Sequence, residues 1–201
     1  VQLLPLIQKR IEIDGVGLKG ASVNTGRLIE GMQLKGELGE LFLRSHGVDL
    51  SPETAVLNNL LLKDAHFSLC MADTTESADT AASEPAFWKI RLEDIDLDNV
   101  SFAMQMPLDS MDFRVKIGNG TLRDGMVDLR KQAYAVNRLS IREGEADYNS
   151  GTSPVLEAGL DPSHIQIKDI NIGIDSVYYE GNHIRALIRE FELKERSGLE
   201  V

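Results

Sequence analysis

The stretch that decides the fold is residues 100–117, which read VSFAMQMPLDSMDFRVKI. An apolar residue stands at every second position on both sides of a turn signal at residues 107–110 (PLDS). This spacing is the period of a β-strand with one buried face, and two such runs joined by a turn signal predict a hairpin. The chain is therefore expected to belong to the all-β class.

Composition sets the broad class of protein. The chain has 201 residues, 42% of them hydrophobic, which is enough to bury a sizeable core in one or two domains. The formal net charge is −11, and no run of basic residues with interleaved aromatics occurs. We therefore expect no nucleic-acid partner, and the acidity by itself indicates solubility rather than a function.

The single cysteine, Cys70, excludes an intramolecular disulfide and any multi-cysteine metal site. Because Cys70 lies in an apolar stretch, we interpret it as core filling. No apolar run approaches the ~18 residues of a membrane span, and the chain begins with VQLLP, without an initiating Met or a basic segment. We expect an excised fragment, with any signal peptide or anchor upstream of it.

Further turn signals divide the rest of the chain into short apolar pieces. Residues 88–149 are interpreted as a meander with turns at residues 118–120 (GNG), 124–125 (DG) and 143–145 (EGE). Near the end, residues 180–182 (EGN) join residues 176–179 (SVYY) to residues 183–186 (HIRA). That sequence has the turn chemistry of a tight hairpin.

Two stretches lack strand character. Residues 72–86 (ADTTESADTAASEPA) are too poor in apolar side chains to repay the entropy of ordering, and they predict a mobile acidic loop. Residues 51–54 (SPET) place a capping residue before a proline and predict one short helix. The expected organisation is one elongated β domain over residues 1–201, with a first sheet portion at 1–71 and the main meander and repeats at 87–201.

An internal repeat runs through the chain. With Φ for an apolar residue, the pattern Φ-x-Φ-x-x-Φ-x-Φ occurs at residues 11–18 (IEIDGVGL), 60–67 (LLLKDAHF), 90–97 (IRLEDIDL) and 165–172 (IQIKDINI). In each copy a charged residue followed by Asp or Gly stands at the central break. The unequal distances between copies argue against a regular solenoid and favour a curved sheet with connections of different lengths.

The break in each repeat predicts a β-bulge. In a regular strand, the step from Leu92 to Ile95 would move the apolar side chains to the opposite face of the sheet. If two residues oppose one residue of the neighbouring strand at the break, both halves of the repeat stay on one face and the strand coils more strongly. We therefore expect long, bent strands with one apolar side.

These apolar stripes are the candidate functional feature. The expected groove-lining residues are Ile90, Leu92, Ile95, Leu97, Ile165, Ile167, Ile170, Ile172, Ile11 and Ile13. Burying one such side chain contributes about 1.5–3 kcal/mol. This free energy is similar whether the side chain packs in a closed core or against a bound acyl chain, so it does not distinguish the two. The predicted fold is a long, curved, bulged, antiparallel-rich sheet, forming an open, β-taco-like groove or an elongated sandwich, with at most one short helix.

The histidines give no signature of a metal site. His46, His66, His164 and His183 stand apart, without the spacing of metal ligands and without an accompanying set of carboxylates or thiols. Because His66 alternates with its apolar neighbours, we expect its side chain on the solvated face. No metal and no cofactor are expected.

Catalytic signatures are also missing from the sequence, which has no nucleophile elbow and no phosphate loop. Asp94, Asp96 and Asp98 alternate along one strand face and are interpreted as its solvent side rather than as a calcium site. We expect a non-catalytic protein. A carbohydrate-active cleft built from paired carboxylates stays open as an alternative, because such residues meet only in space.

Several segments resemble the AsmA-like superfamily. They are residues 92–100 (LEDIDLDNV), 122–129 (LRDGMVDL), 167–172 (IKDINI), and the closing run from 175–179 (DSVYY) to 194–199 (KERSGL). The branch that they resemble is TamB, the translocation and assembly module subunit, in its Bacteroidetes form. The resemblance spans nearly the whole chain, and its motifs are strand patterns rather than a catalytic signature.

The resemblance implies a periplasmic groove that conducts phospholipid between the inner and outer membranes. It also implies an inner-membrane anchor, an N-terminal helix that this chain does not include. The implied partners are phospholipid, outer-membrane assembly components and neighbouring segments of the same chain. The alternative is a structural or assembly scaffold that pairs its edge strands with outer-membrane β-proteins.

Overall fold

The structure is a sheet of unusually long β-strands. The computed structural model describes residues 10–26, 32–50, 52–71, 87–156 and 159–200. The strands are β1 (Arg10–Asn24), β2 (Met32–Asp49), β3 (Thr54–Met71), β4 (Lys89–Met106), β5 (Met111–Asp128), β6 (Ala133–Ser150), β7 (His164–Glu180) and β8 (His183–Glu195). Strands β2 to β6 each have 18 residues, about three times the usual strand length.

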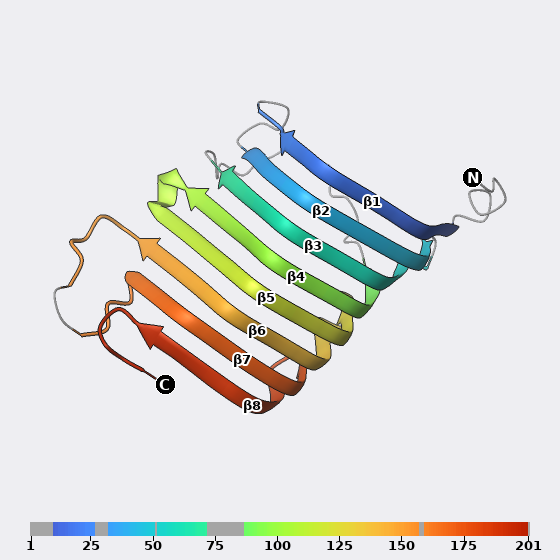
Figure 1. The fold of residues 1–201 in the computed structure, drawn as a ribbon. Helices are drawn as coiled ribbons and strands as arrows, with labels where there is room; N and C mark the ends of the chain where they lie inside the picture. Colours follow the sequence, from blue (N-terminus) through green and yellow to red (C-terminus); the bar gives the residue numbers. More distant parts are fainter. Residues whose placement is uncertain (1–9, 27–31, 51, 72–86, 157–158, 201) are drawn as a thin grey trace.

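All eight strands belong to one open sheet, in which the spatial order follows the chain order. Neighbouring strands are antiparallel except β3 and β4, which are parallel. Figure 1 shows the strands as a single layer that curves along the strand direction. The predicted all-β, antiparallel-rich sheet is confirmed, and the helix found in the described part is one 3-10 turn, η1 (Pro107–Asp109). None of the described residues form a helix long and apolar enough to cross a membrane.

Two predicted hairpin turns are confirmed. Residues 107–110 close the β4–β5 hairpin, with Ser110 in the left-handed region at φ 50°. Gly181, at φ 57°, closes the β7–β8 hairpin, in which Glu180 pairs with His183. Glycine suits this turn because it adopts a positive φ without steric cost.

Three other predicted turns are wrong, because they lie inside long strands. Residues 118–120 and 124–125 fall within β5, and residues 143–145 fall within β6. Asp124 and Glu143 do have the positive φ of turn residues, 53° each. The chain nevertheless continues past both of them, so the turn-forming residues mark kinks inside strands rather than strand ends.

The predicted short helix is also wrong. Pro52 and Glu53 form a turn, with Glu53 at φ 52°, and β3 begins at Thr54. Thr54 pairs with Lys89 of β4, so sheet pairing outweighs the local capping signal. The loop predicted at residues 72–86 lies outside the described residues.

Two rows of kinks cross the sheet. At each kink, one residue of a strand has no partner in the strand pairing. The neighbouring strand also leaves one residue without a partner at the same level. Kink row 1 consists of Gly20, Gly39, Asp64, Asn99, Gly118 and Glu143 on β1 to β6. Kink row 2 consists of Asn58, Glu93, Asp124 and Asn137 on β3 to β6. Because neighbouring strands skip a residue together, their register is the same on both sides of a kink row.

The breaks of the sequence repeat coincide with these interruptions. In the copies at residues 60–67 and 90–97, the skipped residues are Asp64 and Glu93. The expected bulge of two residues against one is wrong for these two copies, since the neighbouring strand carries an extra residue as well.

In the other two copies of the repeat the predicted bulge is confirmed. Between Ile13 and Val16, β1 advances by three residues while β2 advances by two, from Ser45 to Leu43. In the copy at residues 165–172, β7 likewise advances from Ile167 to Ile170 while β6 advances by two residues. At these two breaks the β1–β2 and β6–β7 pairs therefore have bulges, whereas the breaks at Asp64 and Glu93 are shared kinks.

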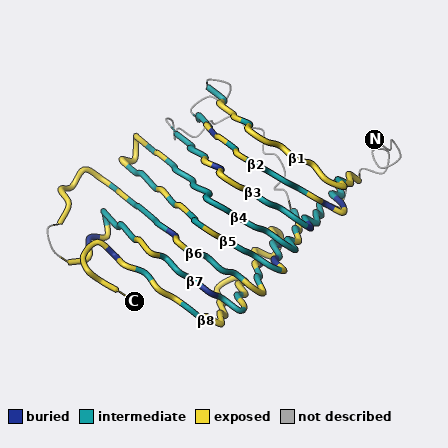
Figure 2. Tube along the Cα trace, in the orientation of Figure 1, coloured by how far each residue is buried: buried dark blue, intermediate teal, exposed yellow. Residues whose placement is uncertain are grey.

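The described part of the sheet encloses no closed hydrophobic core. Its buried apolar side chains are Ala65 and Ala133, and Figure 2 shows buried positions as isolated points on half-buried or exposed strands. The chain exposes 13737 Å² of surface, against about 9400 Å² expected for a compact protein of 22.2 kDa. Of the two predicted arrangements, the structure is the open one and not the sandwich.

Candidate functional site

Most of the apolar side chains of the eight strands gather on one face of the sheet. Residues that pair across neighbouring strands point to the same face. One row of pairs crosses every strand through Leu18, Leu41, Leu62, Leu97, Gly120, Ile141, Ile172 and Phe191. The next row is Val16, Leu43, Leu60, Ile95, Leu122, Leu139, Ile174 and Ile188. We call this side of the sheet the apolar face and the other side the polar face.

Two more apolar rows cross the whole sheet nearer to the start of β1. One consists of Ile11, Val48, Ala55, Ile90, Val127, Tyr134, Tyr179 and Ile184. The other consists of Ile13, Ser45, Leu57, Leu92, Gly125, Val136, Val177 and Ala186. The apolar face is therefore continuous from edge to edge, and Ser45 is the polar exception in these four rows.

The kinks keep the apolar rows on one face of the sheet. They also bend the strands toward this apolar face. A methyl group on Gly125 would lie 3.2 Å from Leu92 Cβ in its own row and 2.9 Å from Leu122 Cδ2, beyond kink row 2. A methyl group on Gly120 would lie 3.0 Å from Ile117 Cγ2, beyond kink row 1. In a straight strand, successive side chains on one face are about 6.6 Å apart along the strand. The convergence of the flanking side chains therefore makes the apolar face the inner side of these two kinks on β5.

The structure places all ten predicted lining residues on the apolar face. Ile90, Leu92, Ile95 and Leu97 follow one another along β4, and the four isoleucines of the 165–172 repeat follow one another along β7. Strands β5 and β6 separate the two sets. None of the ten is buried: Ile11 is 39% exposed and the other nine are half-buried. Uncovered side chains of this kind are available to a ligand.

Sequence reasoning missed many residues of this face. Phe67, Phe102 and Val115 form one of its rows, on β3, β4 and β5. The alternation in residues 100–117 was the signal that could have found Phe102 and Val115. Nothing local indicates that Phe67 lies beside Phe102, because that neighbourhood depends on the parallel pairing of β3 with β4.

The polar face carries the alternating aspartates, as predicted. Arg123 of β5 contacts Asp94 at 3.1 Å and Asp96 at 2.6 Å, and it also donates to the Ile95 carbonyl at 2.8 Å. Asp98 pairs with Lys63 at 3.0 Å. The three carboxylates are thus held by cations on the solvent side of β4 rather than arranged around an ion.

His66 and Cys70 also lie on the polar face of β3. His66 is exposed, as predicted, and its Nδ1 is 2.8 Å from Ser101 Oγ. Cys70 pairs with Gln33 and Gln105 and is half-buried. The interpretation of Cys70 as core filling is wrong, because its strand position alternates with the apolar residues of β3.

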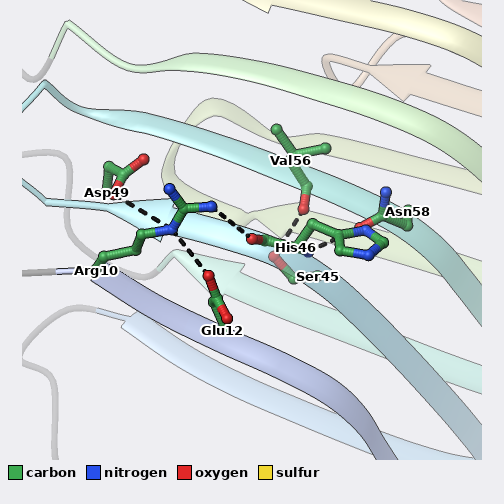
Figure 3. A network of polar contacts seen from close by, with 7 residues as sticks. All are labelled: Arg10, Glu12, Ser45, His46, Asp49, Val56 and Asn58. Carbon is green, nitrogen blue, oxygen red and sulfur yellow. Dashed lines mark hydrogen bonds and ion pairs between the residues drawn. The ribbon is translucent and has the colours of Figure 1, made fainter. Parts of the chain in front are cut away.

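A polar network fixes the bulge of β2 near His46 (Figure 3). Ser45 Oγ donates to the Val56 carbonyl at 2.7 Å, and the His46 backbone N–H donates to Asn58 Oδ1 at 2.7 Å. Arg10 of β1 donates to the His46 carbonyl at 3.2 Å. These bonds satisfy backbone and side-chain groups that the register shift removes from the ladder, so the network is structural.

A hollow of about 810 Å³ lies on the polar face over β3 to β6. Val56, Arg91, Met126 and Ala135, which pair in one row, line it together with the kink residues beside them. Its lining mixes cations, carboxylates and apolar groups, and no set of aligned donors converges in it. It offers no chemistry that the rest of the polar face lacks.

No protein-family model matches this chain, and no curated protein matches it significantly. Among the described residues, no group of three His, Cys, Asp or Glu side chains is placed to hold a metal ion. The arrangement that the structure does offer is a broad, kinked apolar surface.

Proposed function

We propose that this chain is a groove segment that holds or conducts phospholipid acyl chains in the bacterial periplasm, as a non-catalytic part of an AsmA-like, TamB-type protein. The observation that supports the proposal is the apolar face, which runs uninterrupted across eight strands and which no described element covers. A groove of this kind would serve the transport of lipid between the inner and outer membranes. The full-length protein would be held in the inner membrane by an N-terminal helix.

The exposure of the apolar face exceeds what a soluble monomer ordinarily tolerates. On β8 alone, Ile184 is 71% exposed, Ile188 54% and Phe191 44%. Contiguous apolar patches on soluble monomers rarely exceed a few hundred Å² unless they bind something. Contact with an acyl chain would remove this surface from water at about 0.8 kcal/mol per buried methylene.

The chemistry of the face suits transport more than storage. Its rows contain aliphatic and aromatic side chains and glycine, with few hydrogen-bonding groups to fix a ligand at one place. An acyl chain held by contact alone shifts along the rows without breaking a strong bond. The net charge of −11 and the ion pairs of the polar face would keep anionic head groups toward the solvent edge.

The first test is native mass spectrometry of the gently purified chain, with lipid extraction from the same sample. We expect bound phospholipid, and we expect Leu92→Asp and Ile167→Asp to lose it while keeping the strand signal in circular dichroism. Both changes place a charge on the apolar face. Ala103→Asp is the matched control, because Ala103 lies on the polar face of β4 between Ser68 and Arg114.

The outcomes separate the possible roles of the face. Lipid retained in both apolar-face variants, or lost equally in Ala103→Asp, would contradict the proposed lining. Unfolding of Leu92→Asp and Ile167→Asp would show that these residues close a core in solution. A lipid-free, monodisperse wild-type chain would remove the proposal.

Edge pairing is the alternative function, and the two outer strands favour it. On β1, Val16, Leu18 and Val23 are each more than 40% exposed, and β8 is more exposed still. Both strands present unpaired backbone groups that could accept a strand of an outer-membrane β-protein or a neighbouring segment of the same chain. This role predicts capture of unfolded outer-membrane β-strands by lipid-free protein, and failure to capture them would exclude it.

A further inference from the structure

Methionine is concentrated at one end of the apolar face. The chain has six methionines, and four of them stand at the ends of neighbouring strands: Met32 on β2, Met71 on β3, Met106 on β4 and Met111 on β5. We call these four the methionine row. A fifth, Met104, lies one row further in, where it pairs with Leu69 and Phe113.

The pairing of the strands makes the methionine row contiguous. Met32 pairs with Met71, and Met106 pairs with Met111. The parallel β3–β4 ladder runs up to Gln105, so the next residue of each strand, Met71 and Met106, are neighbours as well. Four thioether side chains therefore stand side by side across four strands, a grouping that only this topology produces.

The row lies on the apolar face and is open to solvent. Met71 and Met106 stand two positions beyond Leu69 and Met104, which pair on that face, and no positive-φ residue intervenes. All members of the row are half-buried. Part of each side chain in the row is therefore accessible from this end of the sheet.

Apolar filling alone does not require methionine here. The four complete rows of the apolar face contain none and consist mainly of Leu, Ile and Val. The property that methionine adds is a soft, polarisable thioether on an unbranched, adaptable side chain. Thioethers are ligands that select Cu(I) and similar soft ions over the harder divalent metals.

We propose that the methionine row binds one soft monovalent cation, Cu(I) or Ag(I), through two or three thioether sulfurs. Directly opposite residues of paired strands have Cβ atoms about 4.5–5.5 Å apart, so flexible methionine side chains from adjacent strands can converge on one ion. The site differs in ligand type from the His, Cys and carboxylate sites considered above. It goes beyond the proposed lipid function and does not depend on it.

The test is titration of the 201-residue chain with silver nitrate in chloride-free buffer, followed by native mass spectrometry and calorimetry. Because a thiol is itself a strong ligand for soft ions, all variants carry Cys70→Ser, which changes the opposite face. We expect one Ag(I) per chain, bound at least tenfold more weakly after Met71→Leu with Met106→Leu. Leucine conserves the volume and apolarity of the row while removing its sulfur.

Met126 supplies the matched control. It is the sixth methionine and lies on the polar face of β5, where it pairs with Arg91 and Ala135. Met126→Leu should leave Ag(I) binding unchanged, and methyl-labelled methionine spectra should shift for the row and not for Met126. Leu92→Asp should retain Ag(I) even where it loses lipid.

Three results would overturn the proposal. They are loss of all binding in Cys70→Ser alone, equal affinity in the double leucine variant, and equal weakening by Met126→Leu. Circular dichroism of each variant shows whether the sheet is intact. If the double leucine variant does not fold, the methyl shifts of the Cys70→Ser protein decide the question by themselves.

Discussion

At the scale of single residues, the close contact between Gly118 and Glu143 explains how two neighbouring strands kink together. Glu143 has φ 53°, a conformation that costs an L-residue other than glycine about 1–2 kcal/mol. A methyl group on Gly118 would lie 2.7 Å from Glu143 Cβ and 3.2 Å from the Arg142 carbonyl oxygen. The absence of a side chain at position 118 therefore makes room for Glu143 in kink row 1.

We expect Gly118→Ala to lower the free energy of unfolding by about 1–3 kcal/mol, because the added methyl group overlaps Glu143. Glu143→Gly in the same chain should remove most of this cost, since it deletes the opposing Cβ and relaxes the positive φ. Urea unfolding of both single variants and the double variant measures the coupling between the two positions.

Gly17→Ala is the control for this cycle, because the nearest atom to its new methyl group would be the Leu41 carbonyl oxygen at 3.9 Å. Its cost should be small and independent of Glu143→Gly. Strictly additive effects of Gly118→Ala and Glu143→Gly would contradict the contact.

At the scale of elements, Asp161 organises the connection between β6 and β7. It is 4% exposed, and its carboxylate accepts hydrogen bonds from the Leu156 N–H at 2.9 Å and the Ser163 N–H at 3.0 Å. His164 Nδ1 lies 2.9 Å from the same carboxylate. These contacts, the one from Leu156 above all, hold the pKa of Asp161 below its usual value.

The lowered pKa of Asp161 gives a pH-dependent prediction. A depressed carboxyl pKa contributes stability above the unfolded-state value near 4, and this contribution is lost as the pH falls through the folded-state pKa. Asp161→Asn should therefore destabilise the chain at pH 7, with a smaller difference from wild type in acid. Urea unfolding at both pH values tests this, and an unchanged difference would count against it.

Asp109→Asn is the matched control for Asp161→Asn. Asp109 is exposed in the β4–β5 turn, so its amide variant should stay close to wild type at both pH values. A pH response in this variant equal to that of Asp161→Asn would show a general charge effect instead.

Also at the scale of elements, the sequence predicted the strand class and the repeat breaks better than the strand lengths. The breaks at Asp64 and Glu93 were visible because the apolar period changes phase there. The signals at residues 118–120 (GNG) and 143–145 (EGE) predict turns, because Gly and Asn are common turn residues. In the structure the positive φ belongs to Glu143, and the glycines stand beside or within the kinks. Only the neighbouring strand, which carries its own extra residue, decides that the chain continues.

At the scale of the whole molecule, the open sheet predicts an extended shape in solution. A compact chain of this length would have a radius of gyration of about 16–17 Å. We expect small-angle scattering to give a clearly larger value, with the distance distribution of a flattened particle. A dilution series with light scattering shows whether the particle is a monomer, and a compact monomer would contradict the open sheet.

For the apolar face, the sequence predicts the stripe on each strand but not how the stripes join. Leu92 and Ile167 could be assigned to an apolar stripe from their own strands, because alternation fixes which side chains share a face. The sequence could not predict that the two stripes join through β5 and β6. Their joining depends on which strands are neighbours and in which register they pair.

By itself, the sequence determined that the chain forms strands, where their apolar period breaks, and which residues of each strand share a face. These properties are local, because they depend on side-chain alternation and on backbone preferences of a few adjacent residues. Only the tertiary structure decided the parallel pairing of β3 with β4, the shared kinks and the single open layer. These features depend on contacts between residues far apart in the chain, and no local preference specifies them.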